Sequence, residues 1–412
     1  MISVSEAFEA IRQHVEPASP QNIPLAQAVG RRLAADVRSD VDSPPHDKSM
    51  MDGFAVRSED VQPGMSELRV IETVIAGGWP QKTVEPGQAT RIMTGAPLPP
   101  GADAVVMIEW TETRTDEAGD WVRITAEHIP PGKHRMTQAT NFAASDIVFH
   151  SGHSIRPIDI GLLAEVGCHS VPVYAQPSIA VLPTGNELVD CDRVPDRGQI
   201  RNSNGPMLVA MAQSLGLATT NLGIGRDKPD QLAKRIERGL EHDILILSGG
   251  VSAGMMDLVP GLLKEQGVEQ VFHKVKMKPG KPVWFGVRKS GDRQTIVFGL
   301  PGNPVSSLVG FQLFVRSTID QLTGGTASEP PSEFCLLTKP HQTRGDRPTY
   351  WPGKSINDDQ TSRKVEPLAW NGSSDLRALG LADGLIYFSA DSHDHPAAVS
   401  YTHLTLPTIL LV

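Results

Sequence analysis

The length of 412 residues predicts about two to four domains. The chain carries 38 Lys and Arg against 47 Asp and Glu, a net charge of −9, which argues against a general nucleic-acid binder because phosphate binding needs clustered cations. A small anionic ligand remains compatible, since a local basic pocket can sit in an acidic surface. The three cysteines are far apart, which argues against a disulfide framework or a cysteine zinc site and fits a reducing compartment.

The first residues predict a short amphipathic helix. Ser3 and Glu6 have the spacing of a capping box, and Val4, Phe8, Ile11 and Val15 follow at helical spacing. The same stretch lacks the basic start and apolar core of a signal peptide. Since no apolar run approaches the ~20 residues that span a bilayer, we expect a cytoplasmic protein with no membrane partner.

The remaining chain changes character three times. Residues 66–126 carry short β-like runs broken by Gly and Pro, which indicate a small β-rich domain. In 178–323 short apolar strands alternate with helical segments, which is typical of an α/β domain with a parallel sheet and helices on both faces. Residues 334–412 predict a small β-barrel or sandwich. The last stretch, SYTHLTLPTILLV, is either a final strand or a non-native tail.

Two polar segments in the first half could carry chemistry. Residues 44–55 include Met51-Asp52-Gly53, which reads as a simple turn because Asp-Gly is a common turn pair. The functional alternative presents Asp52 at a cleft as a ligand for a cation. In residues 91–106, Thr94 could donate its hydroxyl and backbone N–H to an anion, or it could belong to a structural turn.

Two further segments follow predicted parallel strands, at the sheet edge where α/β enzymes keep their sites. Glu187 follows the first of these strands. Gly249 and Gly250 follow the strand 243–247, and glycines let backbone N–H groups approach an anion closely. Ser252 adds a hydroxyl donor, and Asp257 either caps the next helix or holds a divalent cation near bound phosphates.

A lysine cluster stands out in this acidic chain. Lys274, Lys276 and Lys278 would share one face of a regular strand. One interpretation is a solvated edge strand protected by lysines. The favoured one is a phosphate or pyrophosphate site, because the stiff turn Pro279–Pro282 fixes Lys281.

The last segments concern helix starts. Gly299–Ser307 runs from a strand through a glycine turn into the apolar helix Leu308–Leu322, an arrangement that can bind an anion, although Asn303 could simply cap the helix. Asp227, two residues before Pro229, stands where a helix N-cap belongs, so capping alone is the favoured interpretation. Together these segments predict a phosphate-containing ligand handled with a divalent metal.

Six motifs in this order resemble the MoeA family, the molybdopterin molybdenumtransferases, and the E domain of gephyrin: MMDGFA, RIMTGAPLPPGADAVV, LPTGNELV, SGGVSAGMMD, KMKPGKP and GLPGNPVS. The resemblance implies insertion of molybdenum from molybdate into adenylylated molybdopterin, with release of AMP and with Mg²⁺. It implies an elongated homodimer whose cleft lies between the α/β domain of one subunit and the Met-Asp-Gly region of the other. Molybdopterin adenylyltransferase and molybdenum-enzyme apoproteins are the implied partners.

The resemblance also implies four domains. These are a linker and dimerisation domain (1–45 with 140–176), a β-rich domain (46–139), an α/β molybdopterin-binding domain (177–326) and a C-terminal β-barrel (327–412).

The site residues follow from the motif matches and the local chemistry. We assign catalytic roles to Asp52, Glu187, Asp257, Lys274 and Lys278, with the three acids as metal ligands. We assign substrate binding to Thr94, Asp227, Gly249, Gly250, Ser252, Lys281, Pro301, Asn303, Ser306, Arg347 and Ser373. Asn141 stands where the family has an acid, Met136 where it has a basic neighbour, and Pro352 where it has a second basic residue of the last domain.

Two rival functions are weighed against this one. An adenylyltransferase would share the α/β domain but lack the Met-Asp-Gly half, so residues 44–106 argue against it. A scaffold or molybdate sensor without turnover is favoured only by Asn141, and the acids Asp52, Glu187 and Asp257 argue against it.

Overall fold

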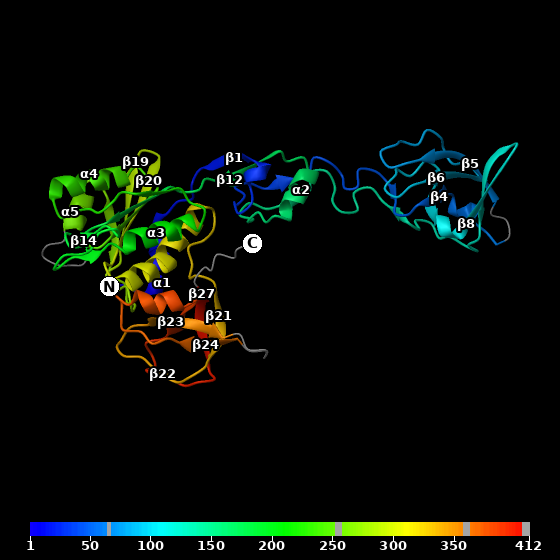
Figure 1. The fold of residues 1–412 in the computed structure, drawn as a ribbon. Helices are drawn as coiled ribbons and strands as arrows, with labels where there is room; N and C mark the ends of the chain where they lie inside the picture. Colours follow the sequence, from blue (N-terminus) through cyan, green and yellow to red (C-terminus); the bar gives the residue numbers. More distant parts are fainter. Residues whose placement is uncertain (64–66, 252–257, 357–362, 406–412) are drawn as a thin grey trace. The chain divides into compact units, whose positions relative to one another are not determined.

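The computed structural model describes residues 1–63, 67–251, 258–356 and 363–405 (Figure 1). The chain forms two compact units, one built from Met1–Gln21 with Tyr174–Val412 and the other from Asn22–Val173. Along the sequence, the second unit is thus inserted into the first. Within the described ranges, no helix is both long and apolar enough to cross a membrane.

The unit Asn22–Val173 contains a six-stranded sheet in the order β7-β4-β6-β5-β9-β8. Its strands are β4 (Gly53–Val56), β5 (Glu67–Val74), β6 (Gln88–Ile92), β7 (Ala104–Met107), β8 (Thr111–Asp116) and β9 (Gly119–Ile124). Only β5 and β6 run parallel among these neighbours. Successive residues of β4 enter different cores, Phe54 one and Ala55 the other, because side chains alternate across a sheet. The β-rich segment expected in 66–126 is confirmed.

A further core of this unit surrounds α2 (Asp159–Glu165) and includes Leu33, Leu163 and Val171. Two pairs of short strands lie beside it: β2 (Val37–Arg38) with β11 (Ile147–Phe149), and β1 (Pro20–Pro24) with β12 (Ser170–Tyr174). A third pair, β3 (Lys48–Ser49) with β10 (Arg135–Met136), contacts the segment 95–97 that follows β6. Single turns of 3₁₀ helix are η1 (Leu25–Gln27), η2 (Ser58–Asp60) and η3 (Ile108–Trp110).

The other unit is built on a six-stranded sheet in the order β16-β13-β17-β20-β19-β18. The strands are β13 (Ile179–Pro183), β16 (Thr219–Asn221), β17 (Ile244–Ser248), β18 (Glu269–His273), β19 (Trp284–Ser290) and β20 (Arg293–Leu300). Every residue of β13 and β17 is buried, as expected for central parallel strands covered on both faces. The α/β fold class predicted for this part of the chain is confirmed.

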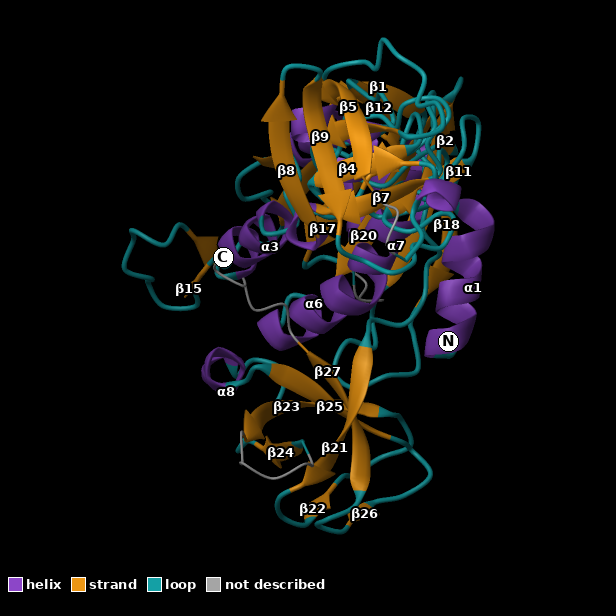
Figure 2. Ribbon diagram, turned by 90° about the vertical axis from the view of Figure 1, so that its right-hand side faces the viewer, coloured by secondary structure: helices purple, strands orange, loops and turns teal. Residues whose placement is uncertain are grey.

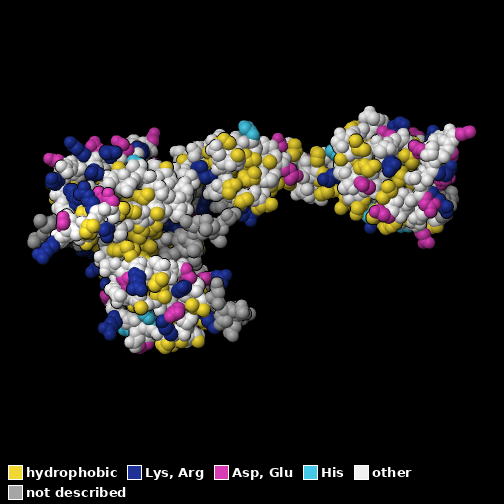
Figure 3. All heavy atoms as spheres, viewed as in Figure 1, with side chains coloured by type: hydrophobic (Ala, Val, Ile, Leu, Met, Phe, Trp, Pro, Cys, Tyr) yellow, Lys and Arg dark blue, Asp and Glu magenta, His cyan; other side chains and the backbone are white. Residues whose placement is uncertain are grey.

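Helices cover both faces of this sheet, as the sequence predicted. The helices are α1 (Val4–His14), α3 (Asn204–Gln213), α4 (Pro229–Gly239), α5 (Leu258–Glu265), α6 (Pro304–Gly310) and α7 (Arg316–Leu322). Helices α1, α3, α6 and α7 share one core and α4 and α5 the other. The outer side of α4 and α5 is charged, with basic and acidic side chains interleaved on the viewed face (Figure 3).

Two helix predictions have different outcomes. The capping box of Ser3 and Glu6 is formed, and it starts α1, which confirms the N-terminal helix. The helix expected over Leu308–Leu322 begins earlier, at Pro304, and contains a π-helical segment, η4 (Phe311–Val315), between α6 and α7.

The parallel sheet that the sequence predicted is interrupted by one strand, because β19 runs antiparallel to both of its neighbours, β18 and β20. Ser290 pairs with Arg293, so only Gly291 and Asp292 connect β19 to β20. A two-residue connection can join only antiparallel strands, and Gly291 has a positive φ of 59°. The Gly-Asp pair was the sequence signal for this hairpin.

The C-terminal part of this unit is a closed five-stranded barrel in the order β21-β24-β23-β25-β27 (Figure 2). Its strands are β21 (Ser332–Leu337), β23 (Thr349–Ile356), β24 (Lys364–Pro367), β25 (Gly384–Phe388) and β27 (Ser400–Thr405). The short strands β22 (His341–Gln342) and β26 (Asp394–His395) pair beside it, and α8 (Leu376–Leu381) precedes β25. A barrel, rather than a sandwich, is thus formed, and the first residues of the final stretch supply its last strand.

Acidification between about pH 6.5 and pH 4 is expected to destabilise the barrel. Burial, with the nearby His395 and Lys339, lowers the pKa of His341 to about 4, and its ring packs 4.2 Å from Trp351. In this window the unfolded imidazole binds a proton and the folded one does not, so folding stability falls as the pH drops and levels off below pH 4. The expected loss is about 1–2 kcal/mol after allowance for solvent screening.

Tryptophan fluorescence melts at a series of pH values would measure this loss. The His341→Gln variant is the control, and it should show a shallower decline across the same window. Equal slopes for the two proteins would contradict the prediction.

Candidate functional site

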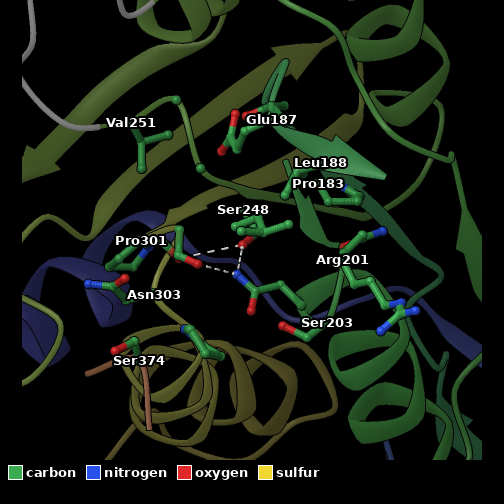
Figure 4. A pocket seen from close by; sticks show the side chains of 18 of the residues that line it. Pro183, Glu187, Leu188, Arg201, Ser203, Ser248, Val251, Pro301, Asn303 and Ser374 are labelled. Atoms are coloured by element: carbon green, nitrogen blue, oxygen red, sulfur yellow. Dashed lines mark hydrogen bonds between the residues drawn. The ribbon is translucent and has the colours of Figure 1, made fainter. Parts of the chain in front are cut away.

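A cavity of about 590 Å³ lies at the carboxyl ends of β13, β17 and β20 in the α/β unit. Figure 4 shows Glu187 and Val251 on one side of it and Asn303 and Ser374 on another, with Ser248 between them. It is lined by Pro183, Thr184, Glu187, Leu188, Ile200–Asn204, Ser248–Val251, Pro282, Pro301–Pro304, Ser374 and Leu376. The cavity thus occupies the edge at which doubly wound sheets bind their ligands.

Gly249 and Gly250, in the turn after β17, line the cavity wall, and the local backbone geometry also requires glycine at both positions. Gly249 and Gly250 have φ values of 92° and 64°, and a Cβ on Gly249 would lie 2.5 Å from the carbonyl oxygen of Thr184. Both glycines are therefore required by the close approach of β13 to this turn. Ser252 and Asp257, assigned from the same motif, lie outside the described residues.

A buried network ties the cavity floor together, and the sequence reasoning missed its centre, Asn204. Asn204 Nδ2 donates to Ser248 Oγ (2.7 Å) and to the carbonyl oxygen of Gly302 (2.8 Å). Ser307 Oγ donates to the carbonyl oxygen of Pro301. One asparagine thus fixes the end of β17 against the turn that leads into α6. Its place at the start of α3, directly after a polar segment, was the available signal.

Among the described residues, the charged side chains that line the cavity are those of Glu187 and Arg201. Glu187 lies in the turn between β13 and β14 (Leu188–Val189), and Arg201 lies in β15 (Ile200–Arg201), which pairs with β14. Both side chains are exposed, and Arg201 Nε donates to the carbonyl oxygen of Arg193 (2.9 Å). In the described part of the chain the Glu187 carboxylate has no hydrogen-bond or ion-pair partner. Arg201 was not predicted, because a lone arginine in a polar loop gives no motif.

The interpretation of Asp227 as a helix cap is wrong. The N-cap of α4 is Lys228, and no side chain caps that helix. The Asp227 side chain is exposed, and its backbone N–H donates to Asn186 Oδ1 (3.1 Å). Asp227 therefore lies beside the turn that carries Glu187, although it does not line the cavity.

Asn303 occupies the N-cap position of α6, but its side chain makes no capping bond. Its Nδ2 donates to Ser373 Oγ (2.8 Å), and the carbonyl oxygen of Ser373 accepts from the backbone N–H of Val305 (3.0 Å). The structure therefore brings Ser373, which we assigned to substrate binding together with Asn303, to the start of α6. Pro301 lines the cavity, whereas Ser306 is buried in the helix.

Lys274, Lys276 and Lys278 do not share a strand face, so that expectation is wrong. Strand β18 ends at His273, and Lys274 has a positive φ of 74°, which interrupts the alternation of a strand. The turn instead packs against the barrel loop that contains Arg347. Arg347 Nη1 donates to the carbonyl oxygen of Met277 (3.0 Å), and Lys278 Nζ lies 3.5 Å from that of Arg344.

Of this turn, Pro282 lines the cavity, whereas Lys274, Lys278, Lys281 and Arg347 are not among the residues that line it. Lys281 directly precedes Pro282 and is exposed. The turn therefore adjoins the cavity without forming part of a regular sheet.

In the unit Asn22–Val173, Asp52 and Thr94 form a pair. The backbone N–H and the hydroxyl of Thr94 each donate to Asp52 Oδ1 at 2.7 Å. These bonds, the backbone one first, hold the pKa of Asp52 below its ordinary value, so the carboxylate is ionised at neutral pH. The two donors that we expected to bind an anion are thus engaged by Asp52. Asp52 Oδ2 has no partner among the described residues.

Asp52 does not belong to a tight Asp-Gly turn. Gly53 opens β4, and a Cβ on it would lie 1.9 Å from the carbonyl oxygen of Val106 in β7. Glycine is therefore required at position 53 because β4 and β7 approach each other closely. Asp52 directly precedes β4 and is exposed at that end of the strand.

The residues that depart from the family pattern have structural partners. Asn141 Nδ2 donates to Ser43 Oγ (3.1 Å), which itself donates to Glu165 Oε1 (2.5 Å). Met136 pairs with Lys48 in the β3–β10 ladder, and Pro352 lies in β23 opposite Leu385.

No preformed cluster of three metal-binding side chains includes a predicted ligand in the ranges that the structure describes. The cluster that it does contain, Glu333, Cys335 and His403, belongs to the barrel, and Glu333 is bound there by Arg363. A cation at Glu187 or Asp52 would need ligands from elsewhere.

Comparison with known proteins agrees with this architecture. Residues 2–167 match the family model for the MoeA N-terminal region (domain I and II), and 180–321 match that for a probable molybdopterin binding domain. A molybdopterin molybdenumtransferase of Staphylococcus epidermidis is 38% identical over 337 residues, which are 80% of this chain and 78% of that protein. One from Staphylococcus aureus is 37% identical over 330 residues, 78% and 76% of the two chains.

A solved structure supports the same relation. The crystal structure of a molybdopterin biosynthesis MoeA protein from Pyrococcus horikoshii has a TM-score of 0.83 at 28% identity and covers 98% of this chain and 99% of that one. The α/β unit with its strand-end cavity thus has the fold of the molybdopterin-binding class. The chain as a whole belongs to the MoeA family, the molybdopterin molybdenumtransferases, and is a transferase of molybdenum cofactor biosynthesis.

Proposed function

We propose that this chain transfers molybdenum from molybdate to adenylylated molybdopterin and releases AMP. The observation that carries the proposal is the strand-end cavity, which combines Glu187, two glycine turns and the adjoining basic turn of Lys278 and Lys281. Such a cavity can hold a phosphorylated pterin, because backbone N–H groups and cations bind phosphate. It also holds an acid at the place where the reaction would occur.

The binding roles follow from position. Gly249, Gly250, Pro301 and Asn303 line the cavity and would contact the pterin phosphate and pyrophosphate. Lys274, Lys278, Lys281 and Arg347 would bind molybdate and the pyrophosphate by charge-assisted hydrogen bonds. Ser373 would act through Asn303, whose amide it binds.

The acids fit a magnesium ion that the substrate helps to bind. Glu187 and Asp52 Oδ2 are exposed carboxylate oxygens with no partner among the described residues, and Mg²⁺ prefers such ligands together with substrate phosphates and water. When bound, the ion would neutralise the pyrophosphate and make AMP a better leaving group. Asp227 lies beside the Glu187 turn and would serve the same ion through water.

We further propose that the protein works as a homodimer in which the Asp52 region of one subunit completes the cavity of the other. Asp52 and Thr94 belong to a unit with its own cores, whereas every residue that lines the cavity belongs to the other unit. Multi-angle light scattering at micromolar concentration should give twice the mass of one chain, and a monomer alone would contradict the prediction. The enzyme that adenylylates molybdopterin and apoproteins that take up the cofactor are the corresponding partners.

Lys278→Ala is expected to weaken molybdopterin binding about ten- to a hundredfold, because a charge-assisted phosphate bond contributes about 1.5–3 kcal/mol. Titration followed by calorimetry would measure the affinity, with a thermal melt on the same sample. Lys276→Ala is the matched control, since Lys276 is exposed in the same turn and was assigned no role. Equal affinities for the two variants would show that Lys278 does not bind the ligand and that the lysines belong to a solvated surface.

Reconstitution tests the function itself. Adenylylated molybdopterin, molybdate and Mg²⁺ are mixed with the protein, and AMP and finished cofactor are measured together. Stoichiometric release of AMP with cofactor supports the proposal. Binding of molybdopterin without AMP release would favour the non-catalytic sensor, and AMP transfer from ATP to molybdopterin would favour the adenylyltransferase.

A further inference from the structure

One arginine, Arg226, binds the backbone of the turn that carries Glu187. No motif in the sequence pointed to it. Arg226 Nη1 donates to three carbonyl oxygens, those of Gly185 (3.2 Å), Asn186 (2.9 Å) and Leu188 (2.7 Å). These carbonyls belong to the residues on both sides of Glu187. One cationic nitrogen thus binds three backbone carbonyl oxygens of the turn. These bonds stabilise the turn, because hydrogen bonds from an ionised donor are stronger than neutral ones.

The same segment also ties Asp227 to the turn. The backbone N–H of Asp227 donates to Asn186 Oδ1 (3.1 Å), and the backbone N–H of Gly185 donates to the carbonyl oxygen of Gly225 (3.0 Å). Thr184 and Gly225 form a parallel bridge directly before these contacts. The turns that carry Glu187 and Asp227 are therefore joined through both backbone and side chains.

The Arg226 guanidinium binds backbone carbonyl oxygens and not the carboxylate of Glu187. An arginine beside a glutamate ordinarily forms an ion pair, but here the guanidinium is bound to carbonyl oxygens and forms no ion pair with Glu187. Gly185 has a φ of 150°, and a Cβ on it would lie 2.4 Å from Glu187 Oε2, so the carboxylate folds back over the glycine. The carboxylate thus lies over the backbone that Arg226 binds, while its charge stays available to a ligand.

We infer that Arg226 is a positioning residue that fixes the Glu187 carboxylate, together with Asp227, for the reaction in the cavity. It acts through the backbone of residues 185–188 and does not itself line the cavity. The inference rests on the proposed role of Glu187 in molybdenum insertion. It predicts that Arg226 matters for the reaction only as long as Glu187 is present.

A double-mutant cycle on the full-length protein tests this dependence. Arg226→Ala is expected to lower the rate of molybdenum insertion about 10- to 100-fold, with molybdopterin affinity changed by less than about threefold. In the Glu187→Gln background the same substitution should lower the residual rate by less than about twofold, because the group that it positions is already lost. If the fold-loss in rate of the double variant equals the product of the two single fold-losses, the inference is overturned and Arg226 has only a general structural role.

Guanidinium rescue and a matched arginine make the test specific. Millimolar guanidinium should restore several-fold activity to Arg226→Ala, but not to the double variant, with sodium chloride as the ionic-strength control. Arg235 also donates to a backbone carbonyl, that of Leu222, away from the cavity. Arg235→Ala should leave the insertion rate within about twofold, and a loss as large as that of Arg226→Ala would overturn the inference. Arg226→Lys, which keeps the charge on a shorter side chain without the planar guanidinium, serves in the same cycle where the alanine variant does not fold.

Amide hydrogen exchange separates this inference from the proposed function. If the wild-type protein inserts no molybdenum, the proposed function fails, and exchange at residues 185–188 then decides on Arg226. Faster exchange at these amides in Arg226→Ala than in Arg235→Ala supports the positioning of the turn. Unchanged exchange overturns it.

Discussion

Glu187→Gln is expected to reduce the rate of molybdenum insertion about 100- to 1000-fold, the loss seen when a group that stabilises transition-state charge is removed. Glutamine has nearly the same shape, so the cavity and its glycine turns should be kept. What is lost is the negative charge of an exposed carboxylate that has no partner among the described residues. Because Mg²⁺ would lose a charged ligand, its affinity should fall, and higher magnesium should restore part of the activity.

The measurement compares cofactor formation, molybdopterin affinity and melting temperature on the same samples. Affinity and melting temperature should stay close to those of the wild type, since an acid that serves the reacting centre lowers turnover and not stability. Asp52→Asn should behave in the same way, because asparagine can still accept the two bonds from Thr94. Asp190→Asn, in the exposed loop after β14, is the control and should remain near full activity. Near-normal rates in both Glu187→Gln and Asp52→Asn would show that these acids only shape their turns.

Gly53→Ala is expected to destabilise the unit Asn22–Val173 by about 3 kcal/mol or more. The added Cβ would lie 1.9 Å from the carbonyl oxygen of Val106, so β4 and β7 would have to move apart. Gly53 pairs with both Ile92 and Met107, which places it in the middle of three strands, and overpacking of such a position is costly. The same shift would displace Asp52, so activity should fall as well.

Gly161→Ala gives a control of opposite sign in the same unit. Gly161 lies in α2, and a Cβ there would meet nothing within 4 Å. Alanine favours a helix over glycine, so this variant should gain about 0.5–1 kcal/mol. Urea unfolding of both variants measures the difference, and a Gly53→Ala midpoint equal to that of the wild type would contradict the close strand approach.

The α/β fold was predictable because its signals are local. Buried strands such as Ile244–Ser248 are short apolar runs, and the capping box of Ser3 and Glu6 needs only residues three apart. Glu187 and Gly249 could be placed at the cavity for a related reason, since each directly follows a predicted strand and all parallel strands end at one edge.

Other features depend on contacts between distant residues and gave no local signal. The chain leaves the strand at Lys274, where the next residue, Val275, pairs with Ile2, and further on Lys278 pairs with Thr349; both partners lie far away in the sequence. Arg201 lines the cavity and Arg226 binds backbone carbonyls, and nothing in their immediate sequence distinguishes these two arginines from solvated polar residues. Asp227 was interpreted as a cap because the spacing to Pro229 fits, yet its backbone N–H is directed to Asn186 across the loop.

The insertion of residues 22–173 into the other unit also affects the order in which the chain can fold during synthesis. Helix α1 leaves the ribosome long before the residues that it packs against, since Phe8 lies 5.5 Å from Phe314 and the backbone N–H of Ala18 donates to the carbonyl oxygen of Leu322. The inserted unit has its own cores and can close as soon as residue 173 is available, since domains generally fold as units during synthesis. Phe8 must wait for about three hundred more residues before Phe314 exists, so this part of the amphipathic face of α1 stays uncovered through most of translation.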